Sequence, residues 1–167
     1  MQPAELVAAL EAARAEMETV LDGLTEAELA QPGAAGDWAV KDVLAHITAW
    51  EAELVTGLAK VRQGRPPGKT NYTADEIQAQ NTRWQAENQG RPLERVLADF
   101  RGVRKQTLRQ IQALTEQELN APRPWLRQGN LVDWVKGWGL EHEEEHARRL
   151  AEWRRGLKAR ADSAAAG

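Results

Sequence analysis

The hexapeptide LTEAEL at residues 24–29 recurs almost unchanged as LTEQEL at residues 114–119. In both copies a threonine stands three residues before a glutamate, which is the spacing of a helix-capping box and predicts a short helical turn. Each copy is followed by a proline, a tryptophan and a long segment of helical periodicity. The repeat therefore indicates two related halves, each with a helix, a capped turn and a second helix. Two such hairpins are expected to pack as a four-helix bundle with one long crossover.

Outside these two turns, apolar side chains recur at helical spacing, and no stretch alternates with a period of two. The pattern predicts an all-α protein with long helices over residues 3–21, 39–62, 92–114 and 130–158. The segment GRPPG at residues 64–68 breaks the chain after the second of these helices. A shorter helix is expected in the crossover over residues 74–88, because Thr73 and the acidic residues after it resemble a helix start.

The length of 167 residues is enough for one domain with a proper hydrophobic core. We expect this domain to span residues 1–160 and residues 161–167 to form a disordered tail. The sequence has no cysteine, which excludes disulfides, thiolate metal ligands and a cysteine nucleophile. It begins without a basic segment and apolar block, and no segment approaches transmembrane length. A cytoplasmic protein without a membrane partner is therefore expected.

The charge distribution argues against a nucleic-acid partner. The formal net charge is −3, whereas binding to a phosphate backbone needs a clustered basic surface. Basic residues do gather between residues 148 and 160, but glutamates alternate with them over the end of the chain, and a solvated helix face explains that run. We therefore expect no nucleic acid among the partners of this chain.

Two of the three histidines, His142 and His146, stand four residues apart in the last predicted helix. They lie about 40° apart on one helix face, so both imidazoles can reach one ion. The same face is apolar, since it also carries Leu131, Val135, Trp138 and Trp153. His46 lies in the matching helix of the other half, and facing helices can bring it against the pair. Three imidazoles with an open coordination position are typical of reactive zinc, and imidazole also suits nickel, copper and ferrous iron.

The same segment offers two carboxylates to a metal site. Residues 142–146 (HEEEH) match the H-E-x-x-H signature of zinc proteases, in which Glu143 would be the general base. We disfavour a protease, because no strand is predicted to hold an extended peptide and the third histidine lies upstream. Glu143 and Glu145 flank the histidine face at about 80° to either side, so either could orient a ligand or accept a proton. A surface ion pair with Arg149 is the alternative for Glu145.

Two segments resemble the DinB-like family of helical proteins. Residues 38–51 (WAVKDVLAHITAWE) are similar to the second-helix motif of that family, and residues 141–148 (EHEEEHAR) to its fourth-helix H-x-x-x-H. The resemblance implies an up-down-down-up four-helix bundle, often dimeric, whose metal ligands would be His46, His142 and His146. The neighbouring ClbS and DfsB-like family has a similar bundle and a similar second helix. The intact histidine triad favours the DinB side.

The resemblance also implies an activity, because relatives of this fold include metal-dependent thiol transferases that use bacillithiol and mycothiol-dependent isomerases. We expect a stress-related metalloenzyme that uses zinc, nickel or iron to transfer a low-molecular-weight thiol to a small electrophile, or else to hydrolyse it. Its expected partners are a small-molecule substrate and a second copy of the chain. The alternative is a non-catalytic protein that binds or sequesters a small molecule and carries a structural or adventitious metal. Candidates for the pocket wall are Trp38, Trp50, Trp84 and Trp138.

Overall fold

The structure, a computed structural model, describes residues 1–126 and 129–165, and this part of the chain contains helices and no β-strand. None of the described helices is long and apolar enough to span a membrane. The predicted all-α class is confirmed. The helices in chain order are α1 (Pro3–Leu21), α2 (Glu26–Ala30), α3 (Val40–Arg62), α4 (Ala74–Asn88), α5 (Leu93–Gln112), α6 (Glu116–Asn120), α7 (Leu131–Val135), the π-helix η1 (Lys136–Glu141) and α8 (His142–Ala165).

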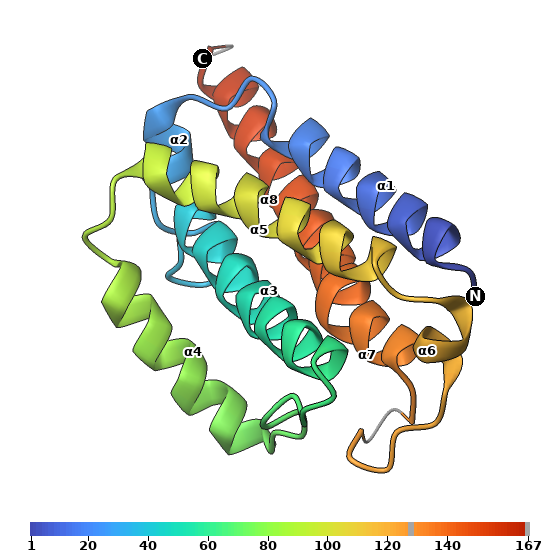
Figure 1. Cartoon of the computed structure of the whole chain (residues 1–167). Coiled ribbons are helices and arrows are strands. Elements are labelled where there is room, and N and C mark those ends of the chain that lie inside the picture. The colour runs from blue at the N-terminus through green and yellow to red at the C-terminus, as the bar shows by residue number, and fades with distance from the viewer. Residues whose placement is uncertain (127–128, 166–167) are drawn as a thin grey trace.

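The four long helices α1, α3, α5 and α8 form a bundle (Figure 1). Helices α1 and α8 run in one direction, while α3 and α5 run in the opposite direction. Helix α4 belongs to the crossover from α3 to α5 and packs against α3, on the side away from α5. The topology is therefore the up-down-down-up bundle that the resemblance implies, with the extra short helix in its crossover.

The repeated hexapeptides form the short helices α2 and α6, and both are capped as predicted. The Glu28 N–H donates to Thr25 Oγ1 at 3.2 Å, and the Thr25 N–H donates to Glu28 Oε2 at 2.7 Å. The second copy repeats this exchange between Thr115 and Glu118, at 3.2 and 2.8 Å. Each exchange satisfies backbone N–H groups that lack a partner within the helix. The equivalence of the two turns supports the division of the chain into two related halves.

The core is divided into two apolar clusters. One cluster includes Leu54 and Ile111, and the other includes Ile47 and Phe100, so the long helices α3 and α5 pass from one cluster to the other. Helix α1 also passes from one cluster to the other, and so does the continuous helical segment formed by α7, η1 and α8. At each crossing point the chain carries one buried charged residue. We call these four residues the charge quartet: Arg14, Glu51, Arg104 and Glu143.

Ion pairs within the charge quartet join all four long helices. Arg14 Nε lies 2.6 Å from Glu143 Oε1, and Arg14 Nη2 lies 3.0 Å from Glu51 Oε2. Arg104 pairs with both carboxylates, and its Nε lies 2.8 Å from Glu51 Oε1. The Thr107 hydroxyl donates a further hydrogen bond to Glu51 at 2.7 Å. Two positive and two negative charges are thus balanced in the interior, where an unpaired charge would be costly.

The last predicted helix differs from the expectation in two places. It begins as α7, continues through the π-helix η1 and becomes a regular α-helix only at His142. Helix α8 then continues to Ala165, past residue 160, where we expected the helical domain to end. Several residues of this extension are alanine, the strongest helix former. Residues 166–167 of the expected tail lie outside the described residues.

Candidate metal centre

The three histidines come together where α3 faces the beginning of α8. His46 Nε2 lies 2.9 Å from His142 Nε2, and His146 Nε2 lies 3.1 Å from the same atom. The three ring centroids are 4.8 to 5.0 Å apart. The pair predicted from its spacing is thus joined by the histidine of the other half, and the three could hold one metal ion.

This arrangement fits a divalent cation. Nitrogen ligands about 2.1 Å from a tetrahedral zinc ion lie about 3.4 Å from one another, close to the two Nε2 separations. A neutral imidazole has only one N–H donor, so rings that converge through Nε2 leave lone pairs facing one another unless a cation or proton lies between them. His46 Nδ1 is buried without a hydrogen-bond partner, so Nε2 is the nitrogen through which this ring is engaged.

Burial lowers the pKa of all three imidazoles. Burial, with a smaller effect of His142 and His146, lowers the pKa of His46 to about 3. Burial, with a smaller effect of His142 and Arg149, lowers the pKa of His146 to about 3. The pKa of His142 is also lowered by burial, against the opposing effect of nearby glutamates. The rings are therefore neutral at neutral pH, which is the form that binds a metal ion.

Metal-free protein is expected to lose stability as the pH falls below about 6.5. The folded-state pKa of His46 and of His146, about 3, lies below the ordinary value of 6.5, so the unfolded chain binds more protons in this range and acid favours it. Each ring can contribute up to about 1.4 kcal/mol per pH unit. Thermal melts in the presence of a chelator should show a smaller dependence on pH for the His46→Gln variant than for the wild type. An identical dependence would contradict this origin.

A π-helical turn precedes the first histidine of α8. The backbone of η1 widens the helix immediately before His142, and such turns are rare and frequently mark functional sites. Within it, the Gly139 carbonyl accepts a hydrogen bond from Arg104 Nη2 at 2.9 Å. Helical periodicity does not reveal this turn, because it predicts one regular helix over residues 130–158. The signal that could have found it is the pair Gly137 and Gly139, which are poor helix formers in the middle of that segment.

The histidines line an open cavity of about 480 Å³. Binding sites for small molecules commonly measure about 300 to 1,000 Å³, so the space suits a small ligand. Its other lining side chains are largely aromatic or neutral polar groups, together with one ion pair at Glu145 and Arg149. They include Trp50, Tyr72, Trp138 and Asn81. The cavity therefore combines the candidate metal ligands with aromatic surface.

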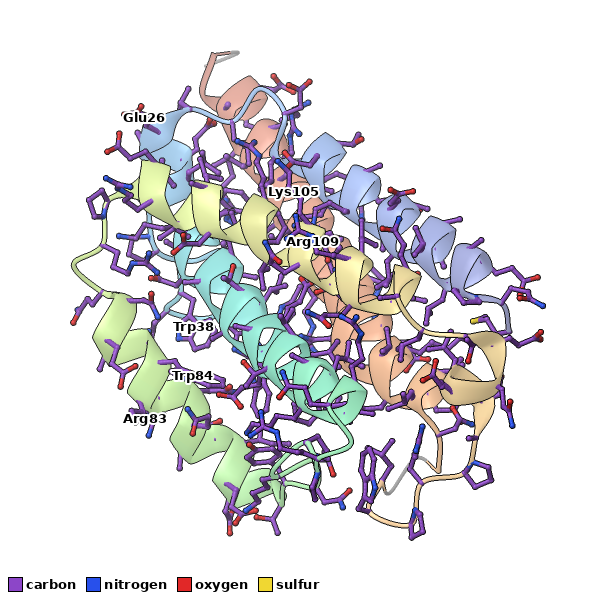
Figure 2. The ribbon with its side chains drawn as sticks, viewed as in Figure 1. Glu26, Trp38, Arg83, Trp84, Lys105 and Arg109 are labelled. Carbon is purple, nitrogen blue, oxygen red and sulfur yellow. The ribbon has the colours of Figure 1, made fainter. Side chains whose placement is uncertain are left out.

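Two of the four tryptophans expected at the pocket wall, Trp50 and Trp138, line this cavity. Trp38 and Trp84 lie instead between α3 and α4 (Figure 2), where they line a smaller cavity that also reaches His46. The Trp38 ring packs edge-on against the His46 ring, with the centroids 5.3 Å apart. Trp38 therefore helps to fix the orientation of a candidate ligand without lining the main cavity.

The structure separates the two candidate carboxylates. Glu143 has no exposed surface, belongs to the charge quartet and does not line the cavity. Glu145 does line the cavity, and it forms the ion pair with Arg149 that the spacing predicts. The geometry therefore brings Glu145, and not Glu143, to the space beside the histidines.

The sequence model of the DinB superfamily matches residues 9–150, which is most of the chain. The chain belongs to the DinB superfamily. No curated protein matches it. Its membership confirms the resemblance found in the second-helix and fourth-helix segments, and the three histidines of those segments are the ones that meet in this DinB protein.

Solved structures of DinB-like proteins share this bundle at low sequence identity. An uncharacterised protein from Escherichia coli UTI89 is 18% identical, with a TM-score of 0.80 over 94% of this chain and 95% of that chain. DfsB, described as a sibling lethal factor precursor, is 16% identical, with a TM-score of 0.79 over 94% and 97%. The colibactin self-resistance protein ClbS is 13% identical, with a TM-score of 0.77 over 90% and 94%. Such low identities show the fold alone.

The ClbS structure corrects one expectation, because ClbS is crystallised in complex with double-stranded DNA. The inference that an acidic net charge excludes a nucleic-acid partner is therefore wrong for a protein of this fold. Net charge is a sum over the whole chain, whereas a duplex responds to the charge of the face that it contacts. The comparisons also show neither a small-molecule substrate nor a homodimer for this DinB protein.

Proposed function

We propose that this DinB protein is a divalent-metal-dependent enzyme in which His46, His142 and His146 hold the ion. Its reaction is the transfer of a low-molecular-weight thiol to a small electrophile, with hydrolysis of the electrophile as the second choice. The observation that supports the proposal most directly is the convergence of three Nε2 atoms at the edge of an open cavity. A structural metal site has four protein ligands and no such opening, whereas a reactive site keeps a position free.

A zinc, nickel or iron ion held by the three histidines would lower the pKa of a thiol or water bound to it, so that this group could lose its proton near neutral pH. The protein's own contribution begins with the three neutral imidazoles, which are prearranged by α3 and α8. Glu145 supplies a carboxylate beside them. In the proposed transfer, the thiol S–H proton passes to Glu145 and a sulfur–carbon bond forms to the electrophile. The bond from that carbon to its leaving group breaks, and the leaving group keeps the electron pair.

The alternative function is sequestration of a small molecule without turnover. Two observations favour it: Glu145 is already held by an ion pair with Arg149, and much of the cavity wall is aromatic. ClbS, which shares the fold, is described as a colibactin self-resistance protein, and a protective role suits either proposed function. In this case the metal is structural or adventitious.

The proposal is tested by incubating metal-loaded protein with chlorodinitrobenzene and a panel of thiols that includes bacillithiol, mycothiol and cysteine. Chloride release above the rate in chelator is expected for at least one thiol. Glu145→Gln should lower this rate roughly 100-fold, as expected for the loss of a general base. Its matched control is Glu144→Gln, since Glu144 is exposed and does not line the cavity.

Hydrolysis is measured with the same variants and the same chelator control. Nitrophenyl acetate then replaces the thiol and chlorodinitrobenzene, and the release of nitrophenol is followed. Binding of either aromatic compound without any product would favour sequestration. Equal rates for the Glu145→Gln and Glu144→Gln variants would remove Glu145 from the mechanism. Equal rates with and without chelator would contradict metal dependence.

A further inference from the structure

Three aromatic side chains from three different segments form one surface beside the histidines. Trp50 comes from α3, Tyr72 from the segment before α4 and Trp138 from η1. The Trp50 ring lies 5.3 Å from that of Tyr72 and 5.2 Å from that of Trp138, both edge to face, and the Tyr72 and Trp138 rings are 5.8 Å apart. We call these three residues the aromatic wall.

The aromatic wall lies about one helical turn from the candidate ligands. On α3, Trp50 follows His46 by four residues, and on the last helical segment Trp138 precedes His142 by four. Because α3 and α8 run in opposite directions, both tryptophans lie on the same side of the histidines. One helical turn is about 5.4 Å. A ligand whose reacting group lies at the histidines therefore reaches the wall with a substituent attached close to that group.

The wall offers mainly carbon surface. The indole N–H of Trp50 is already used, because it donates to Asn81 Oδ1 at 2.9 Å. Further aromatic rings support the wall from outside, with Trp84 5.1 Å from Trp50 and Trp134 5.7 Å from Trp138. Aromatic rings pack favourably edge to face or offset against another ring. A flat aromatic group is therefore the chemistry that this surface accommodates best.

The charge of the cavity points to the same class of ligand. Glu145 and Arg149 are the only formally charged side chains among the described residues that line it, and they are paired with each other. The lining therefore adds no unbalanced charge that would select an anion or a cation. Apart from the charge of the proposed metal ion, which acts on the reacting group at the histidines, selection then depends on apolar contact with the wall.

We infer that the cavity is a binding site for a compound with a planar aromatic group, which packs on Trp50, Tyr72 and Trp138 while its reacting group lies at the histidines. This inference rests on the proposed function and names its substrate class: an aromatic electrophile, rather than an aliphatic or highly charged one. The wall positions the ring, and the ring in turn sets the distance of the reacting carbon from the three imidazoles.

The inference is tested with benzohydroxamic acid and acetohydroxamic acid, which share a metal-binding head and differ in carrying a phenyl or a methyl group. Calorimetry on zinc-loaded protein is expected to show at least about 10-fold tighter binding of the aromatic compound. Trp138→Leu should reduce this preference to less than about 3-fold and leave the affinity for acetohydroxamic acid unchanged. The matched control is Trp153→Leu, because Trp153 packs against the other apolar cluster and does not line the cavity. Equal affinity for the two acids would overturn the inference.

A second variant and a second probe keep the test decisive. Tyr72→Leu removes one ring of the wall from a residue outside every helix, so it serves if the Trp138 variant does not fold. Ligand-observed NMR with naphthol, which has no strong metal-binding head, is expected to show binding to metal-free wild type and weaker binding to Tyr72→Leu. Naphthol binding without any metal uptake would support the aromatic site and contradict the proposed metalloenzyme. Metal uptake without any preference for the aromatic probes would contradict the aromatic site and leave the proposed metalloenzyme standing.

Discussion

Replacing Glu143 by methionine is expected to lower the free energy of unfolding by about 3 to 5 kcal/mol. The substitution keeps an unbranched side chain of similar size but removes one of the two negative charges of the charge quartet. Arg14 and Arg104 are then left with one carboxylate, at Glu51, in an interior where all four side chains are almost fully buried. The excess positive charge cannot be hydrated there, and this is the source of the large cost.

The expected loss is a large part of the stability of an ordinary domain, about 5 to 15 kcal/mol. Chemical denaturation measures it directly, and thermal unfolding should shift by roughly 6 to 20 °C. Glu145→Met is the matched control on the same helix, because Glu145 and Arg149 are 46% and 58% exposed and their ion pair is expected to contribute less than about 1 kcal/mol. Similar losses for the two variants would contradict the balance of charge that we assign to the quartet.

A double variant separates charge balance from simple loss of contacts. Arg14→Met combined with Glu143→Met removes one charge of each sign and leaves Arg104 paired with Glu51. The double variant is therefore expected to be more stable than the sum of the two single losses predicts, by at least about 1 kcal/mol. Strict additivity would mean that the two side chains stabilise the bundle independently of each other.

The charge quartet also bears on the candidate metal centre. Glu143 directly follows His142 in the sequence, and its carboxylate is fixed by arginines from α1 and α5. Arg104 additionally holds the Gly139 carbonyl within η1. These contacts set the rotation of the helix that presents His142 and His146 to α3. The same helix thus uses adjacent residues for two purposes, one facing the core and one facing the cavity.

The bundle could be predicted from the sequence because its signals are local. Helical periodicity is a property of each segment alone, and the caps at Thr25 and Thr115 depend only on the glutamate three residues later. The crossover helix was predicted for the same reason, from the start signal at Thr73, which the structure places at the N-cap of α4. The order of directions came from the resemblance, since periodicity does not say which helices are neighbours.

The charge quartet has a signal in the sequence. Each member occupies a position of the apolar stripe of its helix; Arg14, for example, lies between Leu10 and Met17 at helical spacing. One such charge in each long helix, two of each sign, indicates a buried network. Which charges meet depends on how the four helices are shifted relative to one another along the bundle axis, and local sequence patterns do not give these shifts. For this reason the sequence alone leaves Glu143 as a candidate for the metal site.

The candidate metal centre was predictable in part. The spacing of His142 and His146 places them on one face, whichever fold surrounds them. Bringing His46 to the same point requires that α3 and α8 face each other at one height, which the resemblance implied and the structure shows. The π-helix before His142 and the aromatic wall depend on contacts between segments far apart in sequence, so periodicity could not place them.

His142→Ala is expected to abolish stoichiometric binding of a divalent ion, with an affinity at least about 100-fold below that of the wild type. His142 is the central member of the triad, because its Nε2 lies next to the Nε2 atoms of both His46 and His146. Elemental analysis of protein purified without a histidine tag should find about one zinc, nickel or iron ion per chain in the wild type. Glu144→Ala is the control, since Glu144 is exposed on the same helix and should leave the metal content unchanged.

His46→Ala distinguishes a functional ion from a structural one. The two apolar clusters and the charge quartet do not include His46, so the variant should lose the ion and keep a cooperative unfolding transition. Loss of both the ion and the fold would show that the ion holds the bundle together, and would favour the sequestration protein with a structural metal. A wild-type chain that contains no ion and takes up none on titration would contradict the metalloenzyme altogether. The three histidines would then be partly buried neutral rings beside an aromatic cavity, and ligand binding by that cavity would be the function left to measure.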